Sequence, residues 1–395
     1  MSEVARVPQL RFPEFSNEWE KNKLGNLAVI KSGISPSKYE LKTTGSLPFL
    51  KVEDLNNCRK YQFNSRVYSE SLKNSINKNS VIFPKRGAAI RLNKVRINKV
   101  AALMDSNLMA LLPNTELLNT EFLYYKIMLD GLYKIADTST IPQINNKHIL
   151  PYKLNLPILP EQQKIAAFLT AVDNKIEQLS KKQELLGEYK KGLMQQIFSQ
   201  AIRFRAGDTP GQPLLPNGNS PSGSDFPNWE EKRLGDLCEI TTGKLDANAM
   251  VEGGQYRFYT CAKEYYKIDD YAFDTDALIV SGNGANVGYI HHYQGKFNAY
   301  QRTYVLDSFT DNIIFVKFVL DEYLHKRIMK EKNEGNTPYI VMGTLTDMKI
   351  NLPSFSEQAK ISNFLSSIDT KIEQVGKQLR ESKQFKKALL QQMFV

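Results

Sequence analysis

Two stretches of the chain, residues 156–205 and 352–395, carry apolar residues at spacings that alternate between four and three. This spacing puts the apolar side chains on one face of a helix and is typical of helices that pair knobs-into-holes. Pro160 suits a first helical turn and Glu161 complements the positive helix start, so we expect the first helix to run from Pro160 to about Arg203. The expected pairing positions are Ile165, Leu169, Val172, Ile176, Leu179, Leu186 and Leu193 in the first stretch, and Ile361, Leu365, Ile368, Ile372, Val375, Leu379 and Leu389 in the second.

Polar residues interrupt this apolar face at equivalent positions, most clearly at Lys190 and Lys386. The simpler interpretation is the solvated end of a short coiled coil. The alternative is a device that fixes register or orientation, because a buried polar group costs stability but favours one pairing over others. Each helix would pair most simply with the other, and an antiparallel pairing would relate the two halves of the chain by a pseudo-two-fold axis.

The two halves of the sequence repeat one plan. A segment that opens at Trp19 aligns with one that opens at Trp229, as far as Gly33 and Gly243, and these are the only two tryptophans. LPILPEQQKIAAFLTAVDNKIEQL, residues 156–179, aligns with LPSFSEQAKISNFLSSIDTKIEQV, residues 352–375. YKKGLMQQIF and FKKALLQQMF extend the match to the end of each stretch.

The remaining blocks contain short apolar runs, such as SVIFP, ALIV and TYVL, separated by turn residues. We expect a helix late in each block, near residues 119–131 and 311–332. Residues 206–225 are mostly Pro, Gly, Ser, Asn and other polar types, which predicts a flexible linker. The sequence thus predicts an α+β fold with an internal repeat and an antiparallel coiled coil. Its parts are a mixed α/β domain at 1–155 with a repeated opening segment at 1–33, a helix at 156–205, the linker, a second mixed domain at 226–351, and a helix at 352–395.

Composition and charge indicate a location and a class of partner. No apolar run is long enough to span a membrane, and the first residues lack the apolar core of a signal peptide. The three cysteines show no metal-binding spacing, so we expect a reducing cytoplasm and no metal site. The net charge of +10 indicates an anionic partner, most often nucleic acid. Residues 1–155 hold 23 Lys+Arg and 13 Asp+Glu, net +10, whereas residues 226–351 hold 14 and 18, net −4.

The most concentrated charge lies at residues 71–104, which contain eight cations and no acid. Its centre, FPKRGAAIRLNKVRINKV, predicts a strand, a tight turn at Gly87 and a second strand. Cations on such a hairpin can neutralise phosphates, and arginine can bond guanine with two donors. A solvated basic face is the alternative. The candidate DNA-binding residues here are Lys73, Lys78, Lys85, Arg86, Arg91, Lys94, Arg96 and Lys99.

The corresponding segment of the second block is residues 279–306, which are rich in glycine and short polar residues. The block around this segment has an acidic net charge. Its GxGxxxG spacing departs from the dinucleotide-binding fingerprint, so we interpret it as a glycine-rich turn. Neighbouring residues in a strand point to opposite faces, so the two adjacent histidines are not expected to share a metal. The candidate base-contacting residues are Ser281, Asn283, Asn286, His291, His292, Gln301 and Arg302.

Motifs of catalysis are missing from the sequence. It contains no HExxH, no GxxxxGK[ST] phosphate loop, no GxSxG elbow, and neither an Asn-Pro-Pro-aromatic nor an Asp-Pro-Pro-aromatic tetrad. We therefore expect no catalytic residues and no cofactor in this chain.

The repeated plan resembles the specificity subunits of type I restriction-modification systems. The residues that carry the resemblance are the paired openings from Trp19 to Leu27 and from Trp229 to Leu237, the paired helix starts from Pro157 to Glu177 and from Pro353 to Glu373, and the Lys-Lys…Gln-Gln…Phe helix ends. The resemblance covers essentially the whole chain, and the long linker is a departure from it.

The resemblance implies that each mixed domain is a target recognition domain that reads one half of a bipartite, asymmetric DNA sequence. It implies that the helices set the spacer and dock two methyltransferase subunits, and that the complex recruits restriction-translocation subunits. S-adenosylmethionine, ATP and magnesium would belong to those partners. Two alternatives stay open: a stand-alone DNA nuclease or methyltransferase, and a scaffold that binds proteins only.

Overall fold

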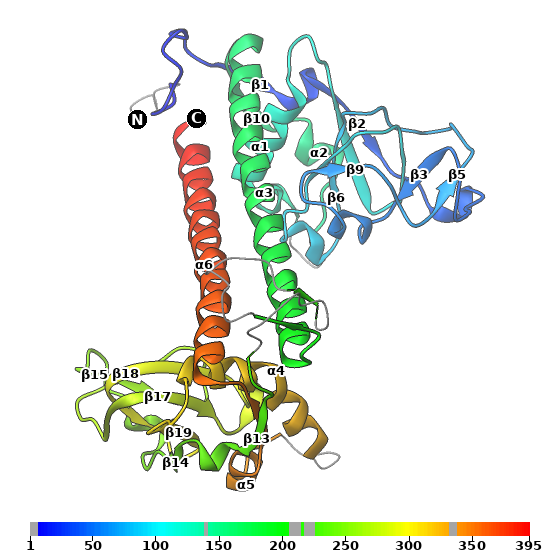
Figure 1. Ribbon diagram of the computed structural model, residues 1–395. Coiled ribbons are helices and arrows are strands. Elements are labelled where there is room, and N and C mark those ends of the chain that lie inside the picture. The colour runs from blue at the N-terminus through cyan, green and yellow to red at the C-terminus, as the bar shows by residue number, and fades with distance from the viewer. Residues whose placement is uncertain (1–6, 138–140, 205–214, 217–225, 332–337) are drawn as a thin grey trace. The chain divides into compact units, whose positions relative to one another are not determined.

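The computed structural model describes residues 7–137, 141–204, 215–216, 226–331 and 338–395, and it divides into two compact units (Figure 1). Unit 1 comprises Met1–Ser180 and Lys377–Val395, and unit 2 comprises Lys181–Gly376. The long helices α3 (Leu159–Phe198) and α6 (Phe355–Gln392) each contribute one part to each unit. Most of the expected linker, 206–225, lies outside the described residues; its two described residues form β12 (Leu215–Pro216), which pairs with β11 (Ile202–Arg203).

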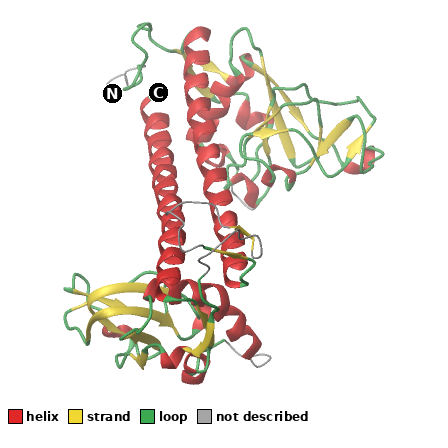
Figure 2. Ribbon diagram, viewed as in Figure 1, coloured by secondary structure: helices red, strands yellow, loops and turns green. Residues whose placement is uncertain are grey.

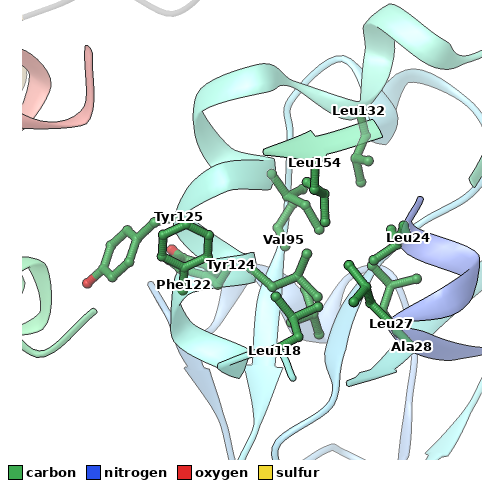
Figure 3. Packing of buried hydrophobic residues seen from close by; sticks show 14 of the residues in the cluster. Leu24, Leu27, Ala28, Val95, Leu118, Phe122, Tyr124, Tyr125, Leu132 and Leu154 are labelled. Carbon is green, nitrogen blue, oxygen red and sulfur yellow. The ribbon is translucent and has the colours of Figure 1, made fainter. Parts of the chain in front are cut away.

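Unit 1 is built on a mixed sheet whose faces are both buried. Val81 and Phe83 of β6 belong to the core under α1 (Thr120–Asp130), while Ile82 between them lies in a second core on the other face. This alternation follows from the two-residue period of a strand. Figure 3 shows the first core, where Phe122 and Leu118 converge with Leu24 and Leu154. The sheet order is β2 (Ala28–Ser32), β9 (Leu108–Pro113), β6 (Val81–Pro84), β7 (Arg96–Asn98) and β4 (Tyr61–Gln62), beside a smaller sheet of β5 (Tyr68–Ser69), β3 (Leu47–Leu50) and β8 (Leu103–Met104).

Unit 2 has the same plan in one six-stranded sheet (Figure 2). Leu278 and Val280 of β17 pack in the core with α4 (Ile313–Glu331), and Ile279 faces a second, aromatic-rich core. The order is β14 (Glu239–Thr242), β19 (Thr303–Asp307), β17 (Phe273–Ser281), β18 (Ile290–Ala299), β15 (Tyr256–Tyr259) and β16 (Tyr266–Ile268). The late helices expected near 119–131 and 311–332 are confirmed as α1 and α4.

A short two-stranded ribbon ties each sheet domain to its helix. In unit 1, β1 (Glu20–Lys23) pairs antiparallel with β10 (Lys153–Leu156), which leads into α3. In unit 2, β13 (Glu230–Arg233) pairs in the same way with β20 (Lys349–Leu352), which leads into α6. The short helices α2 (Asn146–Ile149) and α5 (Met342–Thr346) precede β10 and β20.

The expected helix pairing is present within each unit, and it is antiparallel. In unit 1 the first part of α3 packs in one core with the end of α6, and in unit 2 the last part of α3 packs with the first part of α6. The fully buried pairing positions include Ile165, Leu169, Ile361 and Leu365, whereas Val172, Leu186, Leu193 and Ile372 are half-buried. Ile176, Leu179, Ile368, Val375, Leu379 and Leu389 are buried as well.

The first helix is shorter than expected. It ends at Phe198 instead of continuing to about Arg203, because Gln200 adopts a left-handed φ of 57° and the next residues extend as β11. The side chain of Arg203 then turns back to the buried carboxylate of Glu357, at 2.7 and 3.1 Å. The apolar pattern alone carried no sign of this turn.

The two interrupting lysines form equivalent ion pairs across the helix pair. Lys386 lies 2.6 Å from Asp173 in unit 1, and Lys190 lies 2.6 Å from Asp369 in unit 2. Each pair joins an aspartate early in one helix to a lysine later in the other, so the same antiparallel contact is made once in each unit. The structure thus favours the register device over the solvated end.

The repeat extends to the contacts that the aligned helix starts make with residues outside the aligned segments. Gln162 accepts a hydrogen bond from the backbone of Asn119 before α1, and Gln358 does the same for Asn312 before α4. Arg11 forms a two-bonded ion pair with the buried Glu161, as Arg203 does with Glu357. Phe12 packs on Phe168 and Phe204 packs on Phe364, so Leu10-Arg11-Phe12 and Ile202-Arg203-Phe204 are equivalent.

Candidate nucleic-acid interface

In unit 1, connections from across the chain meet at one end of the main sheet. The strand register places the end of β2 beside the start of β9, with Ser32 opposite Met109, and the end of β6 beside the same place, with Pro84 opposite Leu108. The connections that meet there are residues 33–46, 51–54, 85–95, 105–107 and 141–145.

Backbone hydrogen bonds hold these connections together. Lys85 N–H donates to Asn107 O at 2.8 Å, and Ile144 N–H donates to Lys85 O at 2.9 Å. Asp105 N–H donates to Leu50 O at 2.8 Å, which adds the connection after β3. The loops therefore form one surface with a fixed backbone.

Unit 2 holds its own loops with an equivalent set of bonds. Gly282 N–H donates to Arg302 O at 2.9 Å, and Ile340 N–H donates to Gly282 O at 2.8 Å. Tyr300 N–H donates to Tyr259 O at 2.8 Å. The surface in unit 2 is thus built from residues 243–250, 260–263, 282–289, 300–302 and 338–341.

The paired glycines at the ends of β2 and β14 explain one part of the sequence repeat. A Cβ on Gly33 would lie 2.0 Å from the backbone oxygen of Asp105, and a Cβ on Gly243 would lie 2.0 Å from that of Ala299. Only glycine permits so close an approach of two backbones. Both loop surfaces depend on this contact, which brings the first connection against the others.

The structure divides the eight candidate cations of unit 1 into separate places. The strands expected on either side of Gly87 are present as antiparallel β6 and β7, and Gly87 has the left-handed φ of 75°. The turn between them is longer than expected, since residues 85–95 form a connection that includes a 3-10 turn. This connection carries Lys85, Arg86, Arg91 and Lys94, so these four belong to the loop surface.

The other four cations lie outside the connections that form that surface, and the side chains of two of them are tied to the fold. Arg96 donates to the backbone oxygens of Cys58 and Val95. Lys99 pairs with Glu121 at 3.5 Å and lies over the ring of Tyr61. Lys78 precedes β6 at the opposite end of the sheet, and Lys73 lies on the loop after β5, where its backbone oxygen accepts a hydrogen bond from Tyr39 of the first connection. The unbroken charge run in the sequence is therefore not one patch in space.

Among the clustered cations, Lys85 has an electrostatic environment that suits an anion. It is half-buried, and burial together with the neighbouring guanidinium of Arg86 lowers its pKa from the ordinary lysine value. Both causes disfavour the ammonium, and a bound phosphate would relieve the repulsion between the two cations.

The candidate residues of unit 2 fall mostly on its loop surface. Asn283, Gln301 and Arg302 lie on the connections that meet there, and Gln301 and Arg302 are exposed. Asn286 donates to the backbone of Cys261 at 3.0 Å, which ties the glycine-rich turn to the connection after β15. Ser281 is fully buried, so its side chain cannot reach DNA in this conformation and it leaves the set of candidate contacts.

The two histidines point to opposite faces, as expected from their adjacent positions. His291 bonds the backbone oxygen of Ala262 and packs between Tyr259 and Tyr289, while His292 pairs with Asp276 at 2.8 Å. Burial lowers the pKa of His291, which favours its neutral form. His291 supports the loop surface from beneath, and His292 is separated from it.

The candidates named in unit 2 include one cation, Arg302, and omit Lys244 and Lys263, because the acidic net charge of the domain gave no reason to expect cations there. Lys244, Lys263 and Arg302 all lie exposed on the loop surface, although the domain as a whole is acidic. Lys244 could have been found from the sequence, because it directly follows the repeated Gly243. Lys51, half-buried at the start of the connection after β3, was missed in unit 1.

In the described part of the chain, no group of three or more His, Cys, Asp or Glu side chains is arranged to hold a metal ion. The same residues include no helix that is both long enough and apolar enough to cross a membrane. The site is thus defined by loops that present cations, amides and backbone groups.

The loop surface and the start of the long helix that recur in each unit fall within the two regions that match a known family of DNA specificity domains. The model of the type I restriction modification DNA specificity domain matches the chain twice, at residues 16–186 and 227–381. These matches cover most of the chain, and the protein belongs to this family.

Curated relatives and solved structures agree with this assignment. The chain is 40% identical over 167 residues to the EcoDI specificity subunit of Escherichia coli, covering 41% of this chain and 37% of that relative. It is 23% identical to the MjaVIII specificity subunit of Methanocaldococcus jannaschii, and the match covers 96% of this chain and 92% of that relative. The type I specificity subunit structure from M. genitalium has the same fold, with a TM-score of 0.67 at 18% identity over 98% of this chain and 99% of that one. A chain from a structure of the type I restriction-modification system, solved to explain complex assembly and conformational transition, superposes with a TM-score of 0.54 at 15% identity. The match covers 94% of this chain and 96% of that one.

Proposed function

We propose that this protein is the DNA-recognition subunit of a type I restriction-modification complex. Each loop surface would read one half of a bipartite DNA target. The observation that carries the proposal is the shared backbone framework of the two surfaces, on which different side chains stand. Lys85 and Asn107 in unit 1 take the places of Gly282 and Arg302 in unit 2. The two loop surfaces share a backbone arrangement but differ in their side chains. Such a pair is suited to a target whose two half-sites differ in sequence.

The two readers would use different balances of contacts. Unit 1 offers four clustered cations, which can neutralise backbone phosphates. Unit 2 offers three cations with asparagine, glutamine and backbone groups, a mixture suited to base edges and positioning contacts. Salt would therefore weaken the grip of unit 1 more than that of unit 2.

The helices would set the distance between the half-sites and dock two methyltransferase subunits, and the complex would take up restriction-translocation subunits. This chain would act without catalysis, in the cytoplasm, and hold no cofactor. S-adenosylmethionine, ATP and magnesium would belong to the partners. Methylation requires the target base to rotate out of the base stack. A subunit that binds the duplex on both sides of that base would hold the DNA in place for the methyltransferase.

The test is genome-wide methylation mapping of cells that express this chain with its methyltransferase partner. Replacing residues 20–155 with the same region of another specificity subunit should change one half-site and leave the other and the spacer unchanged. Change in both half-sites would contradict one reader per unit. Absence of any methylated motif, with a complex that assembles, would favour the protein-binding scaffold. Methylation or cleavage by this chain alone with added cofactors would favour the stand-alone enzyme.

A further inference from the structure

A pocket of about 750 Å³ lies in unit 1, and none of the residues that line it belongs to the loop surface assigned to DNA. Its walls come from the residues before and within β4, from α1, and from the parts of α3 and α6 that pair in this unit. Four cations line it, Arg59, Lys60, Lys383 and Lys386, against two carboxylates, Asp173 and Glu177. The lining therefore carries a net positive charge.

Lys60 is the unusual member of this lining. Its residue is only 7% exposed, and its ammonium donates to two neutral groups, Tyr125 Oη at 2.9 Å and Thr170 Oγ1 at 2.7 Å. It also lies over the faces of three tyrosine rings, the nearest being Tyr125 at 4.4 Å to the centroid. No carboxylate in the described part of the chain forms an ion pair with it.

The carboxylates nearest to Lys60 are already engaged by other groups. Asp173 accepts from Tyr125 Oη at 2.6 Å and pairs with Lys386 at 2.6 Å. Glu121 accepts from Tyr61 Oη at 2.6 Å and pairs with Lys99. Among the described residues, the hydrogen bonds of the Lys60 ammonium go to Tyr125 and Thr170 alone, so its third proton has no acceptor there. A buried charge whose hydrogen bonds are incomplete is costly.

We propose that this pocket binds a phosphate-type anion, with Lys60 as its buried anchor and with Arg59 and Lys383 closing over it from the rim. Phosphate or sulfate oxygens would take the remaining proton of Lys60, and charge-assisted bonds of this kind are the stronger ones. The phosphate could belong to a free ligand or to the DNA backbone, and the two sources give different results below.

The titration of Lys60 makes the pocket sensitive to pH. Burial, as the largest cause, lowers its pKa to about 8; Glu121 and Asp173 oppose that shift, and Lys386 and Lys99 add to it. Above that pH the anchor loses its charge. Sulfate, whose own charge is constant between pH 6 and 9, is therefore the suitable probe.

The experiment is calorimetric titration of the full-length chain with sulfate, pyrophosphate and a nucleoside triphosphate. We expect saturable sulfate binding whose affinity falls about tenfold between pH 7 and pH 9, as a lysine titrating near 8 requires. Lys60→Met should lower the affinity at pH 7 by about tenfold and abolish the pH dependence. The exposed Lys147, outside the pocket, provides the control variant Lys147→Met, which should bind as the wild type does.

Three results would overturn the proposal: no sulfate or pyrophosphate binding up to about 10 mM, wild-type binding by Lys60→Met, or an equal loss in Lys147→Met. If Lys60→Met fails to fold, judged by circular dichroism, Arg59→Gln at the solvent rim takes its place, and an unchanged affinity there would also overturn it. DNA titrations separate the sources. If the phosphate is that of DNA, Lys60→Met lowers the salt slope by about one and pyrophosphate competes; if the ligand is free, DNA binding is unchanged. Because the anion is measured without DNA, failure of this site leaves the proposed reading of DNA untouched.

Discussion

The ammonium of Lys190 donates to both carboxylate oxygens of Asp369, at 2.6 and 2.7 Å, across the helix pair of unit 2. Lys190 is 17% exposed and Asp369 is 37% exposed, so water screens the pair only in part. Lys386 and Asp173 form the same contact in unit 1. The polar residues that interrupt the apolar face therefore form equivalent ion pairs in both units.

Reversing one charge of this pair should destabilise unit 2, and reversing both should restore it. Asp369→Lys places two cations together and should lower the free energy of unfolding by about 1–2 kcal/mol. The double variant Lys190→Asp with Asp369→Lys should recover most of that loss. Denaturant unfolding measures both, with Lys191→Asp on the exposed side as the control. A double variant no more stable than Asp369→Lys alone would contradict a direct pairing.

The two arginine–glutamate pairs should respond unequally to the same substitution. Arg11→Ala leaves Glu161, which is 1% exposed, without a counter-charge and should cost about 3–5 kcal/mol in unit 1. Arg203→Ala should cost less in unit 2, because Glu357 keeps a hydrogen bond from Trp229 Nε1 at 3.2 Å. Unfolding followed separately by the two tryptophans would compare the costs. An equal loss in both variants would show that the indole bond contributes nothing.

Cations of the loop surface should affect DNA binding, whereas those elsewhere in the basic run should not. If Arg86 contacts one phosphate, Arg86→Ala lowers affinity and reduces the slope of log K against log salt by about 0.9. Lys78→Ala, an exposed lysine at the other end of the sheet, should leave both unchanged. Fluorescence anisotropy over a salt series distinguishes them. Equal effects from both variants would mean that the whole basic run contacts DNA.

Unit 2 should lose stability on mild acidification through His291. Burial lowers its pKa below the ordinary 6.5, so the unfolded chain binds a proton that the folded chain resists. Stability is therefore full above about pH 6.5 and falls as the pH decreases towards the folded-state pKa. His291→Gln keeps a polar group near Ala262 O and should flatten this dependence. Unfolding midpoints from pH 7.5 to 5 test it, and a wild-type slope in the variant would assign the effect elsewhere.

Lengthening both helices together should change the spacing of the target. Four residues added to α3 after Ser180 and four to α6 after Gly376 fall where the units divide. At 1.5 Å per residue they add about 6 Å, close to two base pairs at 3.4 Å each. Methylation mapping should then show both half-sites unchanged and a longer spacer. An unchanged spacer would show that the helices do not set it.

The sequence was sufficient for the parts of the fold that depend on periodicity and repetition. The apolar face of Ile165 and Leu169 identified the helix pair, and the two tryptophan segments identified the repeat. The loop surfaces were only partly predictable, because they join connections that lie far apart in the sequence, such as Lys85 with Asn107 and Ile144. A run of charge says nothing about which end of a sheet each residue occupies, which is why Lys78 and Lys99 were grouped with Arg86.

The acidic net charge of unit 2 gave no sign of Lys244 and Lys263, for a similar physical reason. Lys244, Lys263 and Arg302 are brought together only by the backbone bonds of the loops. Ser281 was chosen for its residue type, but it is the last residue of the central strand β17 and is fully buried. Cores cover both faces of β17, and residue type alone does not show how far along the strand that cover extends.

The glutamine contacts at the helix starts mean that the helices determine the rotational orientation of the sheet domains as well as a distance. Gln162 bonds the start of α1 and Gln358 bonds the start of α4, so each sheet domain is fixed to the rotation of its own helix. One residue added to a helix turns everything beyond it by about 100°, and only near-whole turns return it to phase. Four added residues overshoot one turn by about 40°, and seven fall short of two turns by about 20°. Every insertion that lengthens a helix therefore also rotates the sheet domain beyond it. We expect helix insertions to give functional targets only at certain spacer lengths, those at which the rotation is close to a whole number of turns.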